Sequence, residues 1–350
     1  MAERLMIYPF SIETAPIIRF SFLVDYEICA AVSPQSWGYT GKDLCFCDGG
    51  PETGIIVSEN FADALHKSDV VFMDFVSDKI CKEVYVKNIH MCLAQGKKTI
   101  ITHRLAEYMG NTLPSSRFIS IIGDNRANET DATSLVPIKT PTIIIVGVGE
   151  CCDKFSVQLA VREYFSGKCN SVLQFGTKGY SELFGILPLP DYLYKPGDIS
   201  KKIISLNRHI HQAVKKARPE LLIIGIPGGF SYMTMETPRN FGELAFCISS
   251  AVVPDACILC VYNDKYEQDY LQAIAAKAAG KLSCEIDAIH ISNRKLLLDP
   301  DALDQKVGFL TVGSTHLSLP NGTFNVFDKA QTNTALSHIY HMLVNTENIV

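Results

Sequence analysis

The stretch 139–165, KTPTIIIVGVGECCDKFSVQLAVREYF, decides the fold of this chain. Its apolar run 142–146 indicates a buried strand, residues 147–153 a glycine-containing turn, and the helical spacing from Lys154 an amphipathic helix. Such a succession opens a βα unit, in which the free amides at the start of the helix point into the turn. The sequence therefore predicts a turn of the kind that can cradle phosphate groups.

The same turn departs from a working phosphate loop, which ends Gly-Lys-Thr or Gly-Lys-Ser. The corresponding residues are Asp153, Lys154 and Phe155, and Ser156 comes one place late. Phe155 lacks the hydroxyl that would hold Mg²⁺, and Glu150 and Asp153 bring negative charge. Each like charge a few ångströms from a phosphate costs about 1–4 kcal/mol, which exceeds the roughly 0.3–1 kcal/mol that a helix terminus contributes. The pattern predicts a degenerate phosphate loop.

Composition limits the class of protein. The chain has 350 residues, long enough for two domains, with 47% hydrophobic and 20% charged residues, which is typical of a globular protein. Its net charge of −5 gives no basic surface for nucleic acid. No apolar run reaches the roughly 18 residues of a membrane span, and the start MAERLMIYPF lacks the apolar core of a signal peptide. We expect a cytoplasmic protein with neither nucleic acid nor membrane as a partner.

Twelve cysteines are present, most of them inside apolar stretches, where they are expected to act as small core residues. Cys257 and Cys260 form a C-x-x-C pattern, but on an expected strand they point to opposite faces, which disfavours a metal or redox pair. Cys45 and Cys47 would share one face of a strand. The adjacent cysteines at 151–152 stand at a helix start, where a thiol pKa can be lowered, although filler within the turn is the simpler interpretation.

The first half of the chain alternates strands and helices. Expected strands cover 4–10, 26–32, 69–75, 98–102 and 118–122, and expected helices cover 60–67 and 79–95. This alternation predicts a doubly wound, parallel sheet of Rossmann-like type over residues 1–125. A Gly- and Pro-rich loop at 34–54 contains the only tryptophan, Trp37, which either anchors a partner or packs on its own domain. The polar segment 126–140 is predicted to be a linker.

The second half, 141–350, predicts a P-loop-NTPase-like α/β domain. Beyond the central unit, strands are expected at 171–175, 220–226, 256–262, 286–291 and 309–312, and helices at 200–218 (capped by Ser200), 241–251, 266–279 and 329–344. The last helix carries His338 and His341 on one face, a spacing that can bind metal, but no third ligand is evident, so no metal site is predicted.

Two segments together resemble a known family. The turn GVGECCDK (147–154) and the strand-turn LLIIGIPGGF (221–230) are similar to the dethiobiotin-synthetase-like and MinD-like branch of P-loop proteins. The resemblance implies ATP or GTP with Mg²⁺ as cofactor and Lys154 as the phosphate-contacting lysine. The family's metal-facing carboxylate is missing, because Ile224 and Gly225 occupy its place. The implied cofactor-binding residues are Gly147, Gly149, Lys154, Ser156, Gly228 and Gly229.

Over most of its length the chain also resembles an uncharacterised clostridial family encoded beside bacteriocin-like precursor peptides and a radical-type peptide maturase. The similar segments are MIYPF, APIIRF, SPQSWGYTGKD and the VGVGE turn. This resemblance implies an accessory role in peptide maturation, with the precursor peptide and the maturase as partners. A homodimer is left open.

Three hypotheses follow for function. The first is the accessory protein, with a degenerate nucleotide-binding fold. The second is an ATP- or GTP-dependent ligase or kinase, in which Ser156 supplies the displaced hydroxyl and acids from 123–131, Glu236 or Glu243 hold the metal. The third, a nicotinamide enzyme, is disfavoured because no G-x-G-x-x-G follows the first strand. Because doubly wound sheets bind ligands beyond the carboxyl ends of their strands, the predicted substrate-binding residues are Arg19, Trp37, Lys42 and Asp43.

Overall fold

The computed structural model describes residues 2–76, 80–233, 241–298, 307–313, 319–320 and 322–345. The chain divides into two compact units, the first made of Met1–Asp124 and Lys178–Pro188, the second of Asn125–Thr177 and Leu189–Val350. The predicted division, 1–125 and 141–350 with a linker at 126–140, differs from this one in two respects. Lys178–Pro188 belongs to the first unit, and 126–140 belongs to the second.

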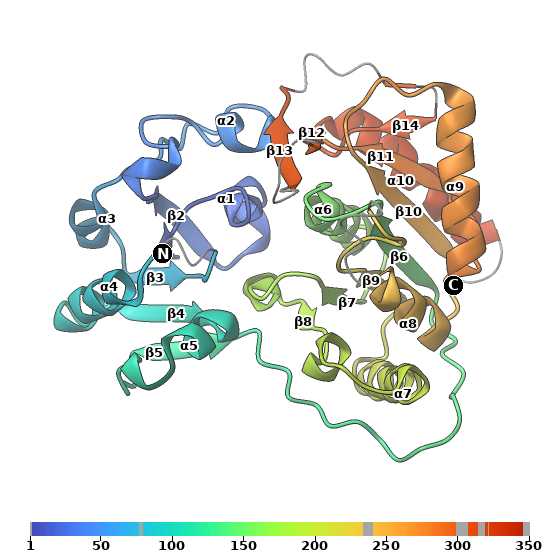
Figure 1. Ribbon diagram of the computed structural model, residues 1–350, viewed down its shortest axis with the longest axis horizontal. Coiled ribbons are helices and arrows are strands. Elements are labelled where there is room, and N and C mark those ends of the chain that lie inside the picture. The colour runs from blue at the N-terminus through green and yellow to red at the C-terminus, as the bar shows by residue number, and fades with distance from the viewer. Residues whose placement is uncertain are drawn as a thin grey trace. The chain divides into compact units, whose positions relative to one another are not determined.

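The first unit is built on a parallel sheet with the strand order β2-β1-β3-β4-β5 (Figure 1). Its strands are β1 (Glu3–Tyr8), β2 (Tyr26–Ala31), β3 (Val70–Met73), β4 (Lys98–Thr102) and β5 (Ile119–Ile122). All four residues of β3 are buried, as expected of a parallel strand covered on both faces. The order reverses at β1, so the crevice where such folds bind ligands lies beyond the carboxyl ends of β1 and β3.

The helices of this unit are α1 (Ala15–Arg19), α2 (Cys45–Asp48), α3 (Phe61–Lys67), α4 (Lys82–Ala94) and α5 (His103–Met109). Local sequence fixes their ends. Asn60 caps α3 by accepting the Asp63 N–H at 3.1 Å, and Gly96, with a φ of 64°, follows the end of α4. The expectation that Cys45 and Cys47 share a strand face is wrong, because both lie in the single turn of α2. The segment Lys178–Pro188 adds a 3₁₀ turn (Ser181–Phe184) and β8 (Leu187–Pro188).

The second unit contains the parallel order β14-β11-β10-β6-β9-β7. Its strands are β6 (Thr142–Gly147), β7 (Val172–Gly176), β9 (Leu221–Gly225), β10 (Ala256–Val261), β11 (Ala288–Ile291) and β14 (Thr323–Phe324), and its helices are α6 (Lys154–Ser166), α7 (Ile199–Ala217), α8 (Glu243–Ala251), α9 (Gln268–Leu282) and α10 (Lys329–Asn345). Residues of α7, α8 and α9 form one buried cluster with the central strands, whereas α6 and α10 contact each other. The predicted class, two doubly wound parallel-sheet domains, is confirmed.

Three local features of this unit were not anticipated. An antiparallel hairpin joins β12 (Arg294–Leu298) to β13 (Val307–Thr311), where only one strand was expected. The cap of α7 is Asp198, whose carboxylate accepts the Lys201 N–H at 2.7 Å, and not Ser200. The segment 126–140 has no helix or strand, yet Asn207 of α7 holds it by accepting the Val136 N–H at 2.7 Å and donating to the Val136 carbonyl at 2.9 Å. Figure 1 shows this segment passing beside α7.

No helix in the described part of the chain is both long and apolar enough to cross a membrane.

Candidate functional site

The turn between β6 and α6 has an unusual backbone. Cys151 and Asp153 adopt left-handed conformations, with φ of 54° and 58°, which L-residues rarely occupy and which cost roughly 1–2 kcal/mol each. Alternation of left- and right-handed residues turns successive N–H groups toward one side and forms an anion-binding concavity. Helix α6 then begins without a side-chain cap, so its first amides also face the turn. Backbone donors are therefore concentrated where a phosphate would bind.

Close packing explains the glycines of the turn. A β-carbon on Gly147 would lie 2.4 Å from the Cys152 sulfur, and one on Gly149 would lie 2.3 Å from the Tyr262 hydroxyl. One on Gly229 would lie 2.6 Å from the Val148 carbonyl oxygen. The Phe230 N–H also donates to the Gly147 carbonyl at 3.0 Å. The turn after β9, with Gly228 and Gly229, thus packs directly on the turn after β6. The glycines predicted to bind the cofactor in the two turns are therefore close together.

Lys154 is the first residue of α6, and only 8% of it is exposed. Its ammonium donates to the Gly149 carbonyl oxygen and lies 3.7 Å from the sulfur of Cys152. No carboxylate of the described residues forms an ion pair with it. The Cys152 thiol donates to the same carbonyl at 3.2 Å, and burial raises the pKa of Cys152. This thiol is therefore protonated, which corrects the suggestion that the helix start lowers its pKa.

Asp153 turns its carboxylate away from the turn. Its Oδ2 accepts from the Ser292 hydroxyl at 2.8 Å and from the Asn293 N–H at 3.0 Å, and its Oδ1 lies 3.9 Å from Nε of Arg294. Burial alone would raise the pKa of Asp153, but the nearby His290, the charge of Arg294 and the hydrogen bond from Ser292 outweigh it, and the pKa is lowered. The charge of Asp153 is thus already compensated. The expectation that it repels phosphate is wrong for this residue.

The partners of Asp153 come from the end of β11 and the start of β12. His290 is fully buried and its Nδ1 accepts the Val326 N–H at 3.2 Å, so the proton of a neutral ring is on Nε2, which faces Asp153 Oδ2 at 3.9 Å. Arg294 is 2% exposed. Neither residue was anticipated, although Ser292, Asn293 and Arg294 directly follow a predicted buried strand, where polar residues are a signal of a site.

A small cavity of about 190 Å³ lies on the β9 side of the turn. Its lining includes Glu150, Gly228, Gly229 and Glu243. Mg²⁺ in nucleotide sites uses one or two carboxylates together with phosphate oxygens, and Glu150 and Glu243 fit that requirement. Glu243 also pairs with the buried ammonium of Lys202 at 2.7 Å. The other predicted metal acid, Glu236, lies outside the described residues.

Ser156, Ile224 and Gly225 are also buried. Ser156 is 5% exposed in α6. Ile224 and Gly225 end β9 within the core, and the Gln158 side chain packs on Gly225. No carboxylate directly follows this strand.

The residues predicted to bind substrate all make internal contacts in the first unit. The guanidinium of Arg19 pairs with Asp48 at 2.8 Å and donates to the Pro51 carbonyl at 2.6 Å. The Asp43 carboxylate accepts the Cys45 and Gly54 N–H groups at 2.9 and 2.7 Å. The Lys42 ammonium lies 3.5 Å from the centre of the Phe46 ring, and Trp37 packs against the core of the unit. Their role in substrate binding stays a prediction.

The carboxyl end of β3 in the first unit is followed by a carboxyl group that was not anticipated from the sequence. Asp74 directly follows β3, and its Oδ1 accepts from the Thr102 hydroxyl at 2.6 Å. Burial raises the pKa of Asp74 to about 6, with Thr102 and the charge of Lys178 opposing the shift. Lys178 forms an ion pair with Glu13. A partly buried acid at a strand end with a raised pKa is a candidate for proton transfer.

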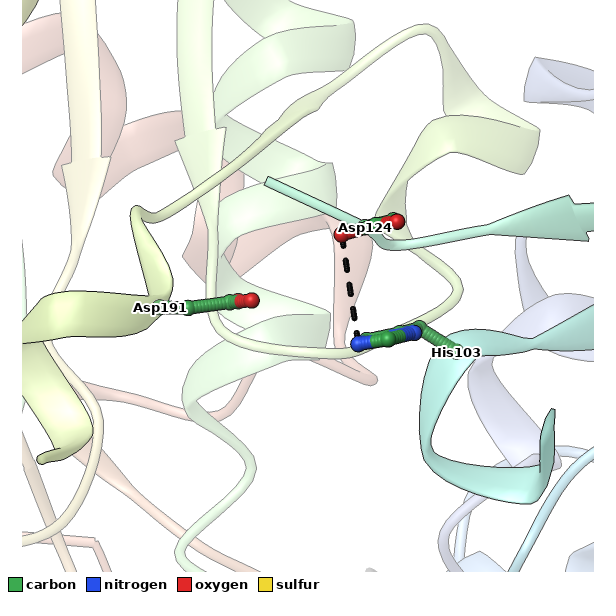
Figure 2. A group of neighbouring side chains, drawn as sticks. All are labelled: His103, Asp124 and Asp191. Carbon is green, nitrogen blue, oxygen red and sulfur yellow. Dashed lines mark ion pairs between the residues drawn. The ribbon is translucent and has the colours of Figure 1, made fainter. Parts of the chain in front are cut away.

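His103, the first residue of α5, directly follows β4, the neighbour of β3 in the sheet. Its Nε2 is 3.4 Å from the Glu107 carboxylate and 3.9 Å from Asp124 Oδ1, the pair joined by the dashed line in Figure 2. The third residue drawn there, Asp191, belongs to the second unit. His338 and His341 of α10 take part in no group of three or more potential metal ligands within the described residues.

Comparison with known proteins relates the chain by fold. No model of a protein family matches the sequence, and no curated protein matches it. The crystal structure of a DUF1611 family protein from Anabaena variabilis ATCC 29413 matches with a TM-score of 0.57 and 14% identity, over 99% of this chain and 93% of that one. This likeness shows a shared fold.

Two further solved structures match in part. One is a GTPase in apo form from Pyrococcus abyssi, with a TM-score of 0.28 and 11% identity over 44% of this chain and 68% of that one. The other is chloroplast FtsY from Physcomitrella patens, with a TM-score of 0.30 and 14% identity over 60% of this chain and 69% of that one. TM-scores this low do not establish that this chain shares the fold of either protein. The resemblance to a peptide-maturation family stays a prediction.

Proposed function

We propose that the second unit binds the phosphate chain of ATP or GTP on the turn between β6 and α6, with Lys154 as the contacting lysine. The observation that carries this proposal is the burial of the Lys154 ammonium without a carboxylate partner in the described chain. An ammonium taken out of water costs several kcal/mol unless it is paired. A carbonyl oxygen and a thiol compensate only part of this cost, and a phosphate would supply the missing negative charge.

The backbone supports the same ligand. The left-handed residues Cys151 and Asp153 and the uncapped start of α6 direct N–H groups into the turn. Asp153 does not oppose an anion there, because Arg294 and His290 hold its charge on the far side. Glu150 and Glu243 border the adjoining cavity, from which they would hold Mg²⁺ against the phosphates. Bound Mg²⁺ would supply positive charge that offsets the charge of Glu150.

Calorimetric titration of ATP and GTP, with and without Mg²⁺, tests the proposal. Lys154→Met keeps the buried aliphatic stem and removes the charge, while Lys168→Met removes a charge from an exposed lysine near the other end of α6. We expect micromolar binding to the unmodified protein and to Lys168→Met, and at least about tenfold weaker binding to Lys154→Met, equal to about 1.4 kcal/mol. Absence of binding at millimolar nucleotide, or equal binding by both variants, contradicts the proposal.

The second candidate is an accessory role in peptide maturation without nucleotide. It is supported by the Lys154 ammonium already bound to the Gly149 carbonyl and by the lack of a carboxylate directly after β9. On this hypothesis the chain binds the precursor peptide or the maturase. Size-exclusion chromatography with the neighbouring precursor and maturase should show co-elution that persists in Lys154→Met. Co-elution with neither protein rules this role out.

A further inference from the structure

A second cavity, of about 320 Å³, adjoins the same turn, and four of its lining residues are tyrosines. We call it the tyrosine cavity, and the lining residues that matter are Val148, Tyr262, Asn263, Tyr266, Tyr270 and Lys277. Its size is at the lower end of the roughly 300–1,000 Å³ typical of ligand pockets. None of the residues proposed to contact phosphate or Mg²⁺ lines this cavity.

The position of the tyrosine cavity relates it to the phosphate turn. Val148 belongs both to the turn and to the cavity wall. Tyr262, which directly follows β10, donates its hydroxyl to the Glu150 carbonyl at 2.6 Å. The smaller cavity with Glu243 lies beside the turn after β9, whereas the tyrosine cavity extends from the segment after β9, with Ser231 shared by both, to the residues after β10. A ligand whose phosphates lie on the turn can therefore extend into the tyrosine cavity.

The aromatic side chains of this cavity are arranged for a flat ring. Tyr266 and Tyr270 are stacked, with ring centres 6.0 Å apart and planes inclined by 14°, and Tyr270 is 59% exposed. The Lys277 ammonium lies 5.3 Å from the centre of the Tyr232 ring, which also borders the cavity. Exposed tyrosine faces bind heteroaromatic rings by stacking.

Asn263 supplies the polar recognition group. Its backbone N–H donates to the Arg294 carbonyl at 2.6 Å, which fixes the residue beside the cavity. Its side-chain Nδ2 is buried and has no hydrogen-bond partner in the described chain. Leaving a buried donor unpaired costs about 1–3 kcal/mol, and an acceptor atom on a bound ring would remove that cost.

We propose that the tyrosine cavity binds the base of a purine nucleotide, stacked against Tyr270 and hydrogen-bonded to Asn263. This inference rests on the proposed binding of phosphates to the turn and adds the part of the ligand that the turn cannot distinguish. The base would lie beside the residues after β10 and the Mg²⁺ beside the turn after β9.

Comparison of ATP and GTP with inorganic tripolyphosphate separates the two proposals. Tripolyphosphate binding that is lost in Lys154→Met reports on the turn alone, whereas any tighter binding of the nucleotide reports on the tyrosine cavity. We expect at least one purine triphosphate to bind tenfold or more tightly than tripolyphosphate. Tyr270→Leu and Asn263→Ala should abolish this difference and leave tripolyphosphate binding unchanged, while Tyr194→Leu, an exposed tyrosine elsewhere in the unit, should preserve it.

Circular dichroism melting curves establish that each variant is folded, and Tyr270→Leu, at an exposed position, provides the test if Asn263→Ala is unstable. If tripolyphosphate and both purine triphosphates bind equally well, or if Tyr270→Leu leaves the difference intact, the base-binding proposal is overturned while phosphate binding stands. If neither tripolyphosphate nor a nucleotide binds, both proposals fail.

Discussion

Two carboxyl groups, one in each unit, show how differently this protein treats the same side chain. Asp74 directly follows the buried strand β3, and Asp153 ends the turn after the buried strand β6. Both are partly enclosed by protein and keep some exposure to water. The pKa of Asp74 is nevertheless raised, to about 6, whereas that of Asp153 is lowered.

The neighbours of each carboxylate account for the difference. Asp153 has the Ser292 hydroxyl, the Asn293 N–H, His290 and Arg294 around it. Asp74 has the Thr102 hydroxyl, and the charge of Lys178 is shared with Glu13. Burial disfavours the charged form in both places, and only the set around Asp153 outweighs it. The sequence near each aspartate gives no hint of this, because the decisive partners are distant in the chain.

The largest expected effect comes from removing the cation beside Asp153. Arg294→Met should leave the carboxylate buried without its positive partner, which typically costs about 3–5 kcal/mol of unfolding free energy. Urea unfolding at pH 7 measures it, with the exposed Lys295→Met as the control. The double variant with Asp153→Asn should regain most of the loss, because no charge is then left unpaired. An Arg294→Met protein as stable as the parent contradicts the role given to this pair.

Asp74→Asn should increase the free energy of unfolding at pH 7, whereas Arg294→Met should decrease it. Because the folded-state pKa of about 6 exceeds the unfolded value, the folded state holds more protons between about pH 4 and 6, and stability falls as pH rises through that window. Above pH 6 the penalty is roughly 3 kcal/mol at most, from about 1.4 kcal/mol per pKa unit. The variant should be more stable than the parent at pH 7 and less dependent on pH.

Urea unfolding at intervals from pH 4 to 7 checks this prediction, with the exposed Asp25→Asn as the matched control. If the parent and Asp74→Asn lose stability in parallel across the window, then Asp74 is not the group that titrates there.

More of the fold than of the candidate site could be predicted from the sequence. Apolar runs bounded by glycines located β6 and β9, and helical spacing located α6 and α7, because strand and helix periods are local properties. The turn, Lys154 and the nearby Gly228 and Gly229 could be found for the same reason. The partners of Asp153 could not, since Ser292 and Arg294 reach it only through the placement of β11 beside β10, about 140 residues along the chain.

The boundary near residue 125 was predicted within one residue, but the assignment of one later segment to the first unit was beyond the sequence. The segment Lys178–Pro188 follows β7 of the second unit, yet Tyr180 packs on Phe72 of β3 and donates to the Glu13 carbonyl. Nothing in its composition distinguishes it from an ordinary loop. The hairpin β12–β13 was missed in part because its first strand follows β11 after only two residues, Ser292 and Asn293.

Thr102→Val tests the hydroxyl that donates to Asp74. Its hydrogen bond lowers the pKa of Asp74, so its removal should raise that pKa further and extend the window of falling stability above pH 6. Hydrogen bonds to charged groups contribute about 1.5–3 kcal/mol, and we expect a loss of about 2 kcal/mol at pH 8 and a smaller loss at pH 4, where the carboxyl is protonated. A loss independent of pH would mean that the Thr102 hydroxyl supports packing and not the charge.

Ser292→Ala removes the same kind of bond, a hydroxyl donating to a carboxylate, from Asp153. The Asn293 N–H, His290 and Arg294 remain, so we expect a loss of only about 1 kcal/mol at pH 7, at the low end for such bonds. The sign of the pH dependence is reversed relative to Asp74. With a lowered folded-state pKa, the stabilisation is present above the unfolded pKa and is lost as pH falls through the folded one. Ser292→Ala should therefore shift acid unfolding to slightly higher pH, which circular dichroism between pH 5 and 2 detects. A cost as large as that of Thr102→Val would show that the four partners of Asp153 act as one unit, in which each depends on the others, and not as independent supports.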